Sequence, residues 1–506
     1  MMNVPLDIPS FSTQNHKEFC WPIPYESYDF LAYGFVDEAL KILESQEGDV
    51  KIALTCKLSD ILIDITHVAR QAIEIKSIKD GGCEVSYDRD ASVVVDCFLN
   101  DGKEIIRHHR SNALKDKALI RARYWKRIVS NCVSPTSAQG YHAMSLNSLM
   151  KEWLAAENVE TVNTLVEFYM YGRPQKNEAA CREIASMFSQ ALNKAYNFEY
   201  PVDGAIQRIT RYHIEQALGD IAFLKRSKLS KSMKQGLVSG TPKYEGRLLG
   251  WYFQDHGKDV TRHAHGGERV FYKDYIWPLA ELPYCSTYFA HSQVEANVMA
   301  KRLKNGDYAV MPDMKNIQFK SRGSDKHQAI YKSAVPSKNN KTLIYVSSVY
   351  LGDLAPNLPA FKMPDSPYFD FQSRLLSFLR DDGWRVIVKP HPKGLYNPAK
   401  LLEPYADDVV IAPFDPNMFE AEVFLFDFAG TAFFDTLASK QRVTLLNLGR
   451  RPFDQVERKQ LEKRCSVYDC GFDDLGRVDL DKEAISNAIA QAPREGFKDF
   501  TKRYTA

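Results

Sequence analysis

The sequence predicts an α/β fold of two domains, with a doubly wound parallel sheet in the second half of the chain. Short apolar runs rich in β-branched residues recur along the chain, and helical patterns separate them, as in β-α-β units. Polar clusters follow several of these runs, at the end of a parallel strand where such folds bind ligands. The chain has 506 residues, more than one hydrophobic core usually supports, so we expect two large domains.

The second half of the chain shows the alternation of strands and helices most clearly. Five apolar runs have the pattern of buried strands, and residues 369–380 have the apolar spacing of a helix. The five predicted strands are residues 342–346, 385–389, 409–412, 423–426 and 443–446. Their alternation with helical segments predicts a parallel, doubly wound sheet.

The first half has a less regular pattern. We predict strands at residues 51–56, 91–98 and 247–253, and an insertion of mainly helical character at residues 143–235. The polar, glycine-rich segment 254–268 is then expected to form a loop after the last of these strands.

These patterns divide the chain into four parts. A stretch rich in Lys, Ser and Asn marks the boundary between the two halves, as is typical of a linker. The expected parts are an α/β domain at residues 1–312 that carries the insertion, a linker at 313–340, a second α/β domain at 341–480 and a helical C-terminal segment at 481–506.

Composition excludes several classes of protein. Hydrophobic residues make up 44% and charged residues 26% of the chain, and the formal net charge is only +2, which indicates neither a disordered chain nor a nucleic-acid-binding protein. Nine cysteines include no Cys-x-x-Cys pair, which fits a reducing compartment. No apolar run approaches the roughly 20 residues that span a bilayer, and no signal-peptide pattern opens the chain. We expect a cytoplasmic protein, with peripheral attachment to the inner membrane as the alternative.

The predicted strand at 385–389 ends in a Pro-His-Pro turn flanked by two lysines. Lys389, His391, Pro392 and Lys393 place an imidazole and two cations at the carboxyl end of a parallel strand, where an anionic ligand group can bind. A rigid turn with a solvated histidine is the alternative, because proline fixes such a turn whatever the histidine does.

Two further strand ends carry small polar residues. Ser347 and Ser348 follow the first strand of this half, and Gly430 and Thr431 follow the fourth, directly before a helical pattern. The free N–H groups at a helix start can bind phosphate, although threonine there also serves as an ordinary N-cap. We predict that these strand ends together form an anion-binding site.

The segment 254–268 supplies the candidates for acid–base chemistry: Asp255, His265 and Glu268. His263 and His265 are two residues apart, so they point to opposite sides of an extended chain, which disfavours a shared metal ion. A polar, glycine-rich loop at a strand end is a candidate functional site. We predict that it lies opposite the anion-binding residues.

The order of these elements resembles that of the two-domain GT-B glycosyltransferases of bacterial surface polysaccharide biosynthesis. Within them, the likeness is to the group that includes the CDP-glycerol glycerophosphotransferases and the CMP-sialic acid and CMP-Kdo transferases. It covers roughly residues 247–450. His391-Pro392 matches the His-Pro motif that contacts the donor phosphate in that group. The segment 427–431 is similar to a phosphate-binding Asp-Tyr-Ser-Ser segment, but one residue longer.

The segment 265–268 is similar to the His-Gly-Thr-Pro loop that supplies a proposed base in the glycerophosphotransferases. Gly267 and Glu268 depart from that pattern, which weakens the case for glycerol phosphate transfer. The resemblance therefore implies His265 as the first candidate base, followed by Glu268 and Asp255. The implied donor-binding residues are Ser347, Ser348, Lys389, His391, Pro392, Lys393, Gly430 and Thr431.

The resemblance implies two Rossmann-like domains, of which 341–480 binds the donor nucleotide, and a metal-independent glycosyl transfer to a surface glycan or its lipid-linked precursor. A CMP-linked acidic sugar is favoured over a UDP-sugar as the donor. One alternative is a CDP-polyol phosphotransferase, and another is a non-catalytic, nucleotide-sugar-binding subunit of an envelope-assembly complex. The expected partners are the donor and the glycan acceptor, without nucleic acid, and no cofactor is expected because the donor is itself a substrate.

Overall fold

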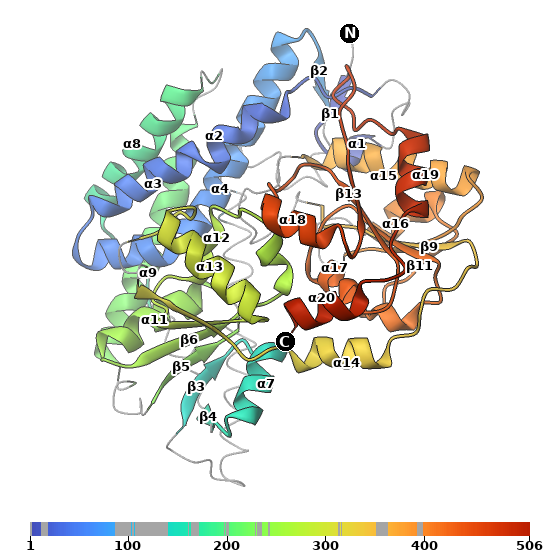
Figure 1. The fold of residues 1–506 in the computed structure, drawn as a ribbon. Helices are drawn as coiled ribbons and strands as arrows, with labels where there is room; N and C mark the ends of the chain where they lie inside the picture. Colours follow the sequence, from blue (N-terminus) through green and yellow to red (C-terminus); the bar gives the residue numbers. More distant parts are fainter. Residues whose placement is uncertain are drawn as a thin grey trace.

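A computed structural model of the chain shows two parallel sheets with helices packed on them (Figure 1). Each sheet has six strands, and the predicted α/β class with parallel sheets is confirmed. The residues that the structure describes are 3–11, 19–86, 103, 106, 140–159, 161–162, 172–196, 198, 202–227, 229, 235–240, 243–311, 314, 316–350, 363–391 and 398–505.

The second sheet is formed by the C-terminal half of the chain, coloured orange to red in Figure 1. Its strands lie in the order β11-β10-β9-β12-β13-β14, and all neighbours are parallel. The central strands β9 and β12 are buried at every position, as their apolar sequences require. The strands are β9 (Thr342–Val346), β10 (Arg385–Lys389), β11 (Asp408–Val409), β12 (Val423–Phe426), β13 (Val443–Asn447) and β14 (Ser466–Asp469).

The strand order reverses between β9 and β12, so the carboxyl ends of these two strands form the position where doubly wound sheets bind ligands. Four of the five predicted strands agree with the structure to within one residue, whereas β11 is shorter than predicted. The predicted helix at 369–380 lies within α15. The helices of this half are α15 (Asp365–Asp381), α16 (Pro398–Leu402), η6 (Glu403–Tyr405), η7 (Pro416–Met418), α17 (Thr431–Leu437), α18 (Gln455–Leu461), α19 (Lys482–Ala490) and α20 (Phe497–Tyr504).

The first sheet has the order β4-β3-β5-β6-β7-β8 and is also parallel throughout. Its strands are β3 (Tyr141–Met144), β4 (Thr161–Val162), β5 (Gly236–Ser239), β6 (Asp259–His263), β7 (Thr287–Ala290) and β8 (Gln318–Ser321). The helices around it are α7 (Ser148–Ala156), α11 (Tyr244–Asp255), η4 (Gly267–Phe271), α12 (Trp277–Glu281), α13 (Gln293–Asn305) and α14 (Asp325–Ser333).

Several predictions for the first half are wrong. Residues 51–56 lie in the long helix α4 and residues 247–253 in α11, because a short buried apolar run has the same composition in a helix as in a strand. The predicted loop 254–268 contains the strand β6. The predicted linker 313–340 contains β8, which completes the first sheet, and α14. The strand predicted at 91–98 lies outside the described residues.

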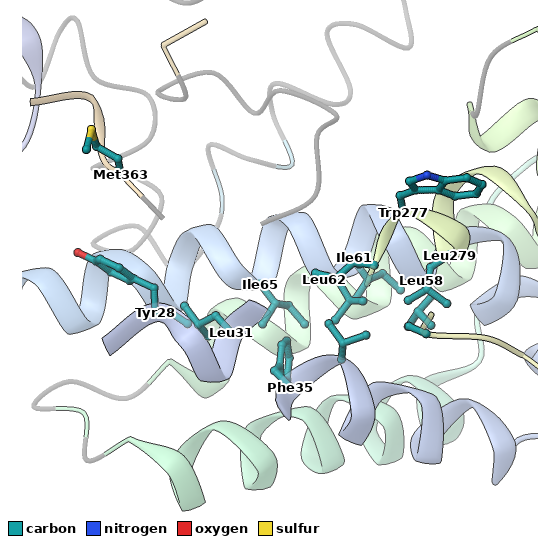
Figure 2. Close-up of a cluster of buried hydrophobic side chains, with 14 of the residues drawn as sticks. Tyr28, Leu31, Phe35, Leu58, Ile61, Leu62, Ile65, Trp277, Leu279 and Met363 are labelled. Atoms are coloured by element: carbon teal, nitrogen blue, oxygen red, sulfur yellow. The ribbon is translucent and has the colours of Figure 1, made fainter. Parts of the chain in front are cut away.

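A layer of long helices packs beside the first sheet. The predicted helical insertion 143–235 contains α8 and α9 as expected, but it also contains strands of the sheet itself. Figure 2 shows apolar side chains of α4, such as Leu62 and Ile65, in a cluster with Phe35 and Trp277. The long helices of this layer are α3 (Gly34–Glu44), α4 (Gly48–Asp80), α8 (Glu178–Ala195) and α9 (Asp203–Arg226).

The N-terminal residues connect this helical layer to the second half. A two-stranded parallel sheet joins β1 (Asn3–Pro5) to β2 (Glu84–Ser86), which follows α4. The backbone N–H of Trp21 donates to Leu475 O at 2.7 Å, and the hydroxyl of Tyr25 donates to Gly476 O at 3.1 Å. The short elements of this region are α1 (Ile8–Phe11), η2 (Tyr25–Tyr28) and α2 (Asp29–Ala32). Among all the helices in the described part of the chain, none is both long enough and apolar enough to cross a lipid bilayer.

The two halves meet through an apolar interface. Phe271 at the end of η4 packs against Phe434 of α17, with ring centroids 6.2 Å apart, and against Phe500 of α20 at 6.4 Å. All three rings are buried. An apolar interface of this kind opposes free movement of one half relative to the other.

Candidate active site

Two loops from different sheets meet at the junction of the halves. One follows β6, and the other follows β12 and leads through Gly430 into α17. A Cβ atom added to Gly266 in the first loop would lie 2.1 Å from Glu268 Oε2 and 2.7 Å from Thr431 Oγ1. A Cβ atom there would force the side chains of Glu268 and Thr431 to shift. The structure thus brings the predicted acid–base segment against the predicted anion-binding residues.

The next glycine makes a similar close contact, with the ring of Phe434. A Cβ atom added to Gly267 would lie 2.5 Å from the ring of Phe434. Both residues are buried, so the ring could move aside only at the expense of its packing against Phe271 and Phe500. The two glycines therefore set how closely η4 approaches α17.

Glu268 is the acid–base candidate that is buried in this contact. Its side chain is buried in η4, and Oε2 has no hydrogen-bond partner. An unsatisfied buried oxygen of this kind costs about 1–3 kcal/mol, which a hydroxyl group placed beside it would recover. His265, the first candidate from the sequence, is exposed on the same loop.

Asp255 lies at the opposite end of the strand. It is the exposed last residue of α11, and β6 with its five residues separates it from the loop that carries His265. A strand of that length spans roughly 15 Å. The prediction that Asp255, His265 and Glu268 share one loop is wrong, and Asp255 is not part of the site.

The carboxyl ends of β9 and β12 carry a connected set of buried polar groups. Asp427, directly after β12, accepts hydrogen bonds from the hydroxyls of Tyr345 and Tyr368 and from the backbone N–H of Ser348. The Tyr368 hydroxyl also accepts from that N–H at 2.8 Å. Burial raises the pKa of Asp427, against the opposing effects of the Arg450 charge and of these donors. The carboxyl group thus holds the backbone after β9, while Oγ of the buried Ser347 has no hydrogen-bond partner.

The strand β10 presents a buried lysine at the same edge. Lys389 is 4% exposed, and its Nζ donates to Pro390 O at 3.1 Å. No carboxylate within the described residues forms an ion pair with it, and burial lowers its pKa. His391 follows and is half-buried. Pro392 and Lys393, also predicted as donor contacts, lie outside the described residues.

A hydrogen-bonded network joins α17 to α14. His327 of α14 contacts Asp435 Oδ1 through Nε2 at 2.9 Å, and Lys326 Nζ lies 2.8 Å from both carboxylate oxygens. Burial lowers the pKa of His327, so the neutral ring donates to the carboxylate. Burial favours the neutral form of Asp435, but the bond from His327 and the charge of Lys326 outweigh it and lower its pKa. This network fixes α17 to the chain segment between the two sheets.

Asn147 holds the loop after β6 in place. Its side-chain amide donates to the carbonyl oxygens of Gly240, His263 and Ala264 at 2.8–3.2 Å. Its oxygen accepts from the backbone N–H of Met150 at 2.8 Å and so caps α7. One side chain therefore joins the ends of three neighbouring strands of the first sheet.

The two histidines of the loop have opposite environments. His263 is buried and stacks on Phe289 with ring centroids 5.1 Å apart, and burial lowers its pKa to about 3. His265 is exposed. Within the ranges given above, no three His, Cys, Asp or Glu side chains gather in a way that could hold a metal ion.

Sequence reasoning missed Arg450. It follows β13 by three residues and is buried, with its guanidinium 3.8 Å from the centre of the Tyr368 ring. The signal was present in the sequence, because Gly449-Arg450-Arg451 comes soon after the predicted strand 443–446. That position is another carboxyl end of the same sheet.

No protein-family model matches the sequence, and no curated protein matches it at a significant level.

Proposed function

We propose that this chain is a GT-B glycosyltransferase, which moves a sugar from a nucleotide-activated donor to a surface glycan or a lipid-linked glycan. The observation that carries the proposal is the close approach of Gly266 to both Glu268 and Thr431. It sets a buried carboxylate from one parallel sheet beside the predicted phosphate-binding end of the other. A transfer reaction needs these two functions, a base for the acceptor and charge stabilisation for the leaving group, within reach of each other.

The second sheet is the donor side in this proposal. Lys389 is the last residue of β10, and Ser347 directly follows the neighbouring strand β9, next to the reversal of strand order. Buried, fixed donors stabilise the charge that develops on a leaving phosphate without having to reorganise. Ser348, His391, Gly430 and Thr431 complete the proposed donor contacts, and no metal is required for them to act.

Glu268 is the proposed base, in preference to His265. A base must lie within hydrogen-bond distance of the acceptor hydroxyl. Glu268 Oε2 is held at the junction without a hydrogen-bond donor, whereas His265 is exposed. His265 is then placed to contact the acceptor. Because the two halves already pack together through Phe271 and Phe434, the account requires no closure of one half onto the other.

A CMP-linked acidic sugar is the proposed donor, on the resemblance of His391-Pro392 to the His-Pro motif of enzymes that use cytidine nucleotides. A CDP-polyol phosphotransferase would use the same phosphate contacts but would attack phosphorus instead of carbon. Both reactions release CMP. Incubation with CMP-sugars or CDP-glycerol, followed by the mass of the modified acceptor, identifies the transferred group.

The cheapest test of the donor side is thermal unfolding with CMP, CDP, UDP and GDP. A ligand at 100 times its Kd stabilises the folded state by about 2.7 kcal/mol. We expect cytidine nucleotides to raise Tm most, and no response to any nucleotide would contradict the proposal. His391→Ala should weaken the nucleotide effect more than His265→Ala, because the two residues lie on different sheets. The opposite order would mean that the donor and acceptor sides are exchanged.

A further inference from the structure

The buried arginines of the described residues fall into two classes. Seven of them donate to carboxylates or to backbone carbonyl oxygens: Arg247, Arg262, Arg302, Arg442, Arg451, Arg464 and Arg477. Arg464, for example, donates to Leu437 O, Thr436 O, Ser439 O and Gln441 O at the end of α17. Arg450 is the exception. Its one hydrogen bond is a long contact of 3.9 Å from Nη2 to Met363 Sδ.

Arg450 donates a hydrogen bond to no carboxylate of the described residues, and its charge acts on Asp427 only at longer range, where it lowers the pKa of that carboxyl group. The residue is 4% exposed, its Nε has no hydrogen-bond partner, and no carboxylate of the described residues forms an ion pair with it. Its guanidinium lies over the ring of Tyr368, a contact that orients the group but offers no oxygen acceptor. A buried guanidinium whose N–H groups lack oxygen acceptors is costly. Such a site is suited to an anionic group of a bound ligand.

Further unpaired donors lie on the same edge of the sheet. Tyr368 connects Arg450 to Ser348, because its ring lies under the guanidinium and its hydroxyl accepts from the Ser348 N–H. Ser347 Oγ, which is buried and lacks a partner, is the neighbouring side chain on that segment. Lys389 is the second buried cation of this edge, and no carboxylate of the described residues forms an ion pair with it. The ends of β9, β10 and β13 thus carry two buried cations and one buried hydroxyl.

We propose that Arg450 binds a phosphate group of the ligand, together with Lys389 and Ser347. The guanidinium offers parallel N–H donors in a fixed geometry that matches two oxygens of one phosphate, whereas Lys389 supplies a compact charge. That this phosphate belongs to the nucleotide donor rests on the proposed function. The phosphate site itself rests on the unpaired donors.

The test compares Arg450→Met with Arg477→Met in the full-length protein. Arg477 is equally buried but donates to Asp370 at 2.6 and 3.1 Å, so its loss should lower Tm by several degrees. Arg450→Met should lower Tm less than Arg477→Met when no ligand is present, because Arg450 donates to no carboxylate and interacts with Asp427 only at longer range. The probes are inorganic phosphate, CMP and the uncharged nucleoside cytidine.

Wild-type protein should be stabilised by phosphate and by CMP, and Arg450→Met should lose roughly 10- to 100-fold in affinity for both. Cytidine binding, if measurable, should be equal in the two proteins. Arg450→Lys should fall between them, because it keeps the charge and loses the paired geometry. Two results would overturn the inference: a fall in Tm of ligand-free Arg450→Met that equals that of Arg477→Met, or unchanged affinity for phosphate.

The inference and the proposed function fail in distinguishable ways. If phosphate stabilises only the wild type and no nucleotide binds to either protein, the anion site stands and the nucleotide donor is wrong. If CMP binds equally to both proteins, the nucleotide donor stands and the role of Arg450 is wrong.

Discussion

The carboxyl edges of the two sheets differ in which buried polar groups lack a hydrogen-bond partner. On the first sheet they include the Ser239 hydroxyl and Glu268 Oε2. On the second they include Arg450 Nε and the Ser347 hydroxyl. Unsatisfied groups are available to a ligand, and a carboxylate oxygen suits a base whereas a cation suits an anionic group. The comparison assigns the proposed base to the first sheet and the proposed anion contacts to the second.

The largest expected effect on stability comes from a buried carboxyl group in the helical layer, away from both carboxyl edges. Burial raises the pKa of Glu74 from 4.5 to about 7, although Arg70 and the hydroxyl of Tyr28 lower it. The folded state therefore holds the proton more tightly, and stability is lost as pH rises from about 4.5 through 7. At pH 8, Glu74→Gln should be more stable than wild type by on the order of 3 kcal/mol.

Urea unfolding between pH 5 and pH 8 measures this effect. Burial also raises the pKa of Asp220 to about 7. The stability of both proteins should therefore depend on pH, but that of wild type should depend on it more. The difference between wild type and Glu74→Gln should grow with pH. Equal pH slopes in the two proteins would contradict the assignment.

The next effect tests how closely the two sheets approach each other. Gly267→Ala should destabilise the protein by about 1–3 kcal/mol, because the added methyl group would overlap the Phe434 ring. Chemical denaturation measures the loss. Gly471→Ala is the matched control, since a Cβ there would meet no atom within 4 Å and its φ is not positive. Equal stability of the two variants would mean that η4 and α17 are not in contact.

The smallest effect on stability tests whether Asn147 positions the loop after β6 without taking part in nucleotide binding. Asn147→Ala should cost about 1–2 kcal/mol through the lost cap and carbonyl contacts, and it should slow transfer because the loop that carries Glu268 loses its support. Nucleotide binding should be unchanged. Asn177→Ala removes the N-cap of α8, whose side chain accepts from Ala180 at 3.2 Å, and should leave transfer intact. A loss of nucleotide binding in Asn147→Ala would break the division of roles between the sheets.

The second sheet could be predicted from the sequence because its strands are continuous apolar runs. β9 and β12 are buried at every position, and the predicted bounds match the structure. β6 could not be found in this way, since its sequence Asp-Val-Thr-Arg-His has the composition of a loop. Its Arg262 is nevertheless buried, because three carbonyl oxygens accept from its guanidinium. Partners that lie far along the chain leave no local pattern.

The candidate site was partly predictable for the same reason. Residues that follow apolar strands, such as Ser347, Lys389 and Gly430, stand out by position alone. The contact of Gly266 with Thr431 depends on how the two sheets pack, and the distinction between Arg450 and the other buried arginines depends on a missing partner. The misplacement of Asp255 follows from the undetected strand β6.

The role of Glu268 as the base at the junction is the central claim, and the rate of transfer by Glu268→Gln at saturating donor tests it most directly. The change keeps the size of the side chain and removes the proton acceptor. The account predicts a fall in kcat of about 10²–10⁴, with an unchanged Tm response to CMP. A variant that transfers at the wild-type rate would contradict it.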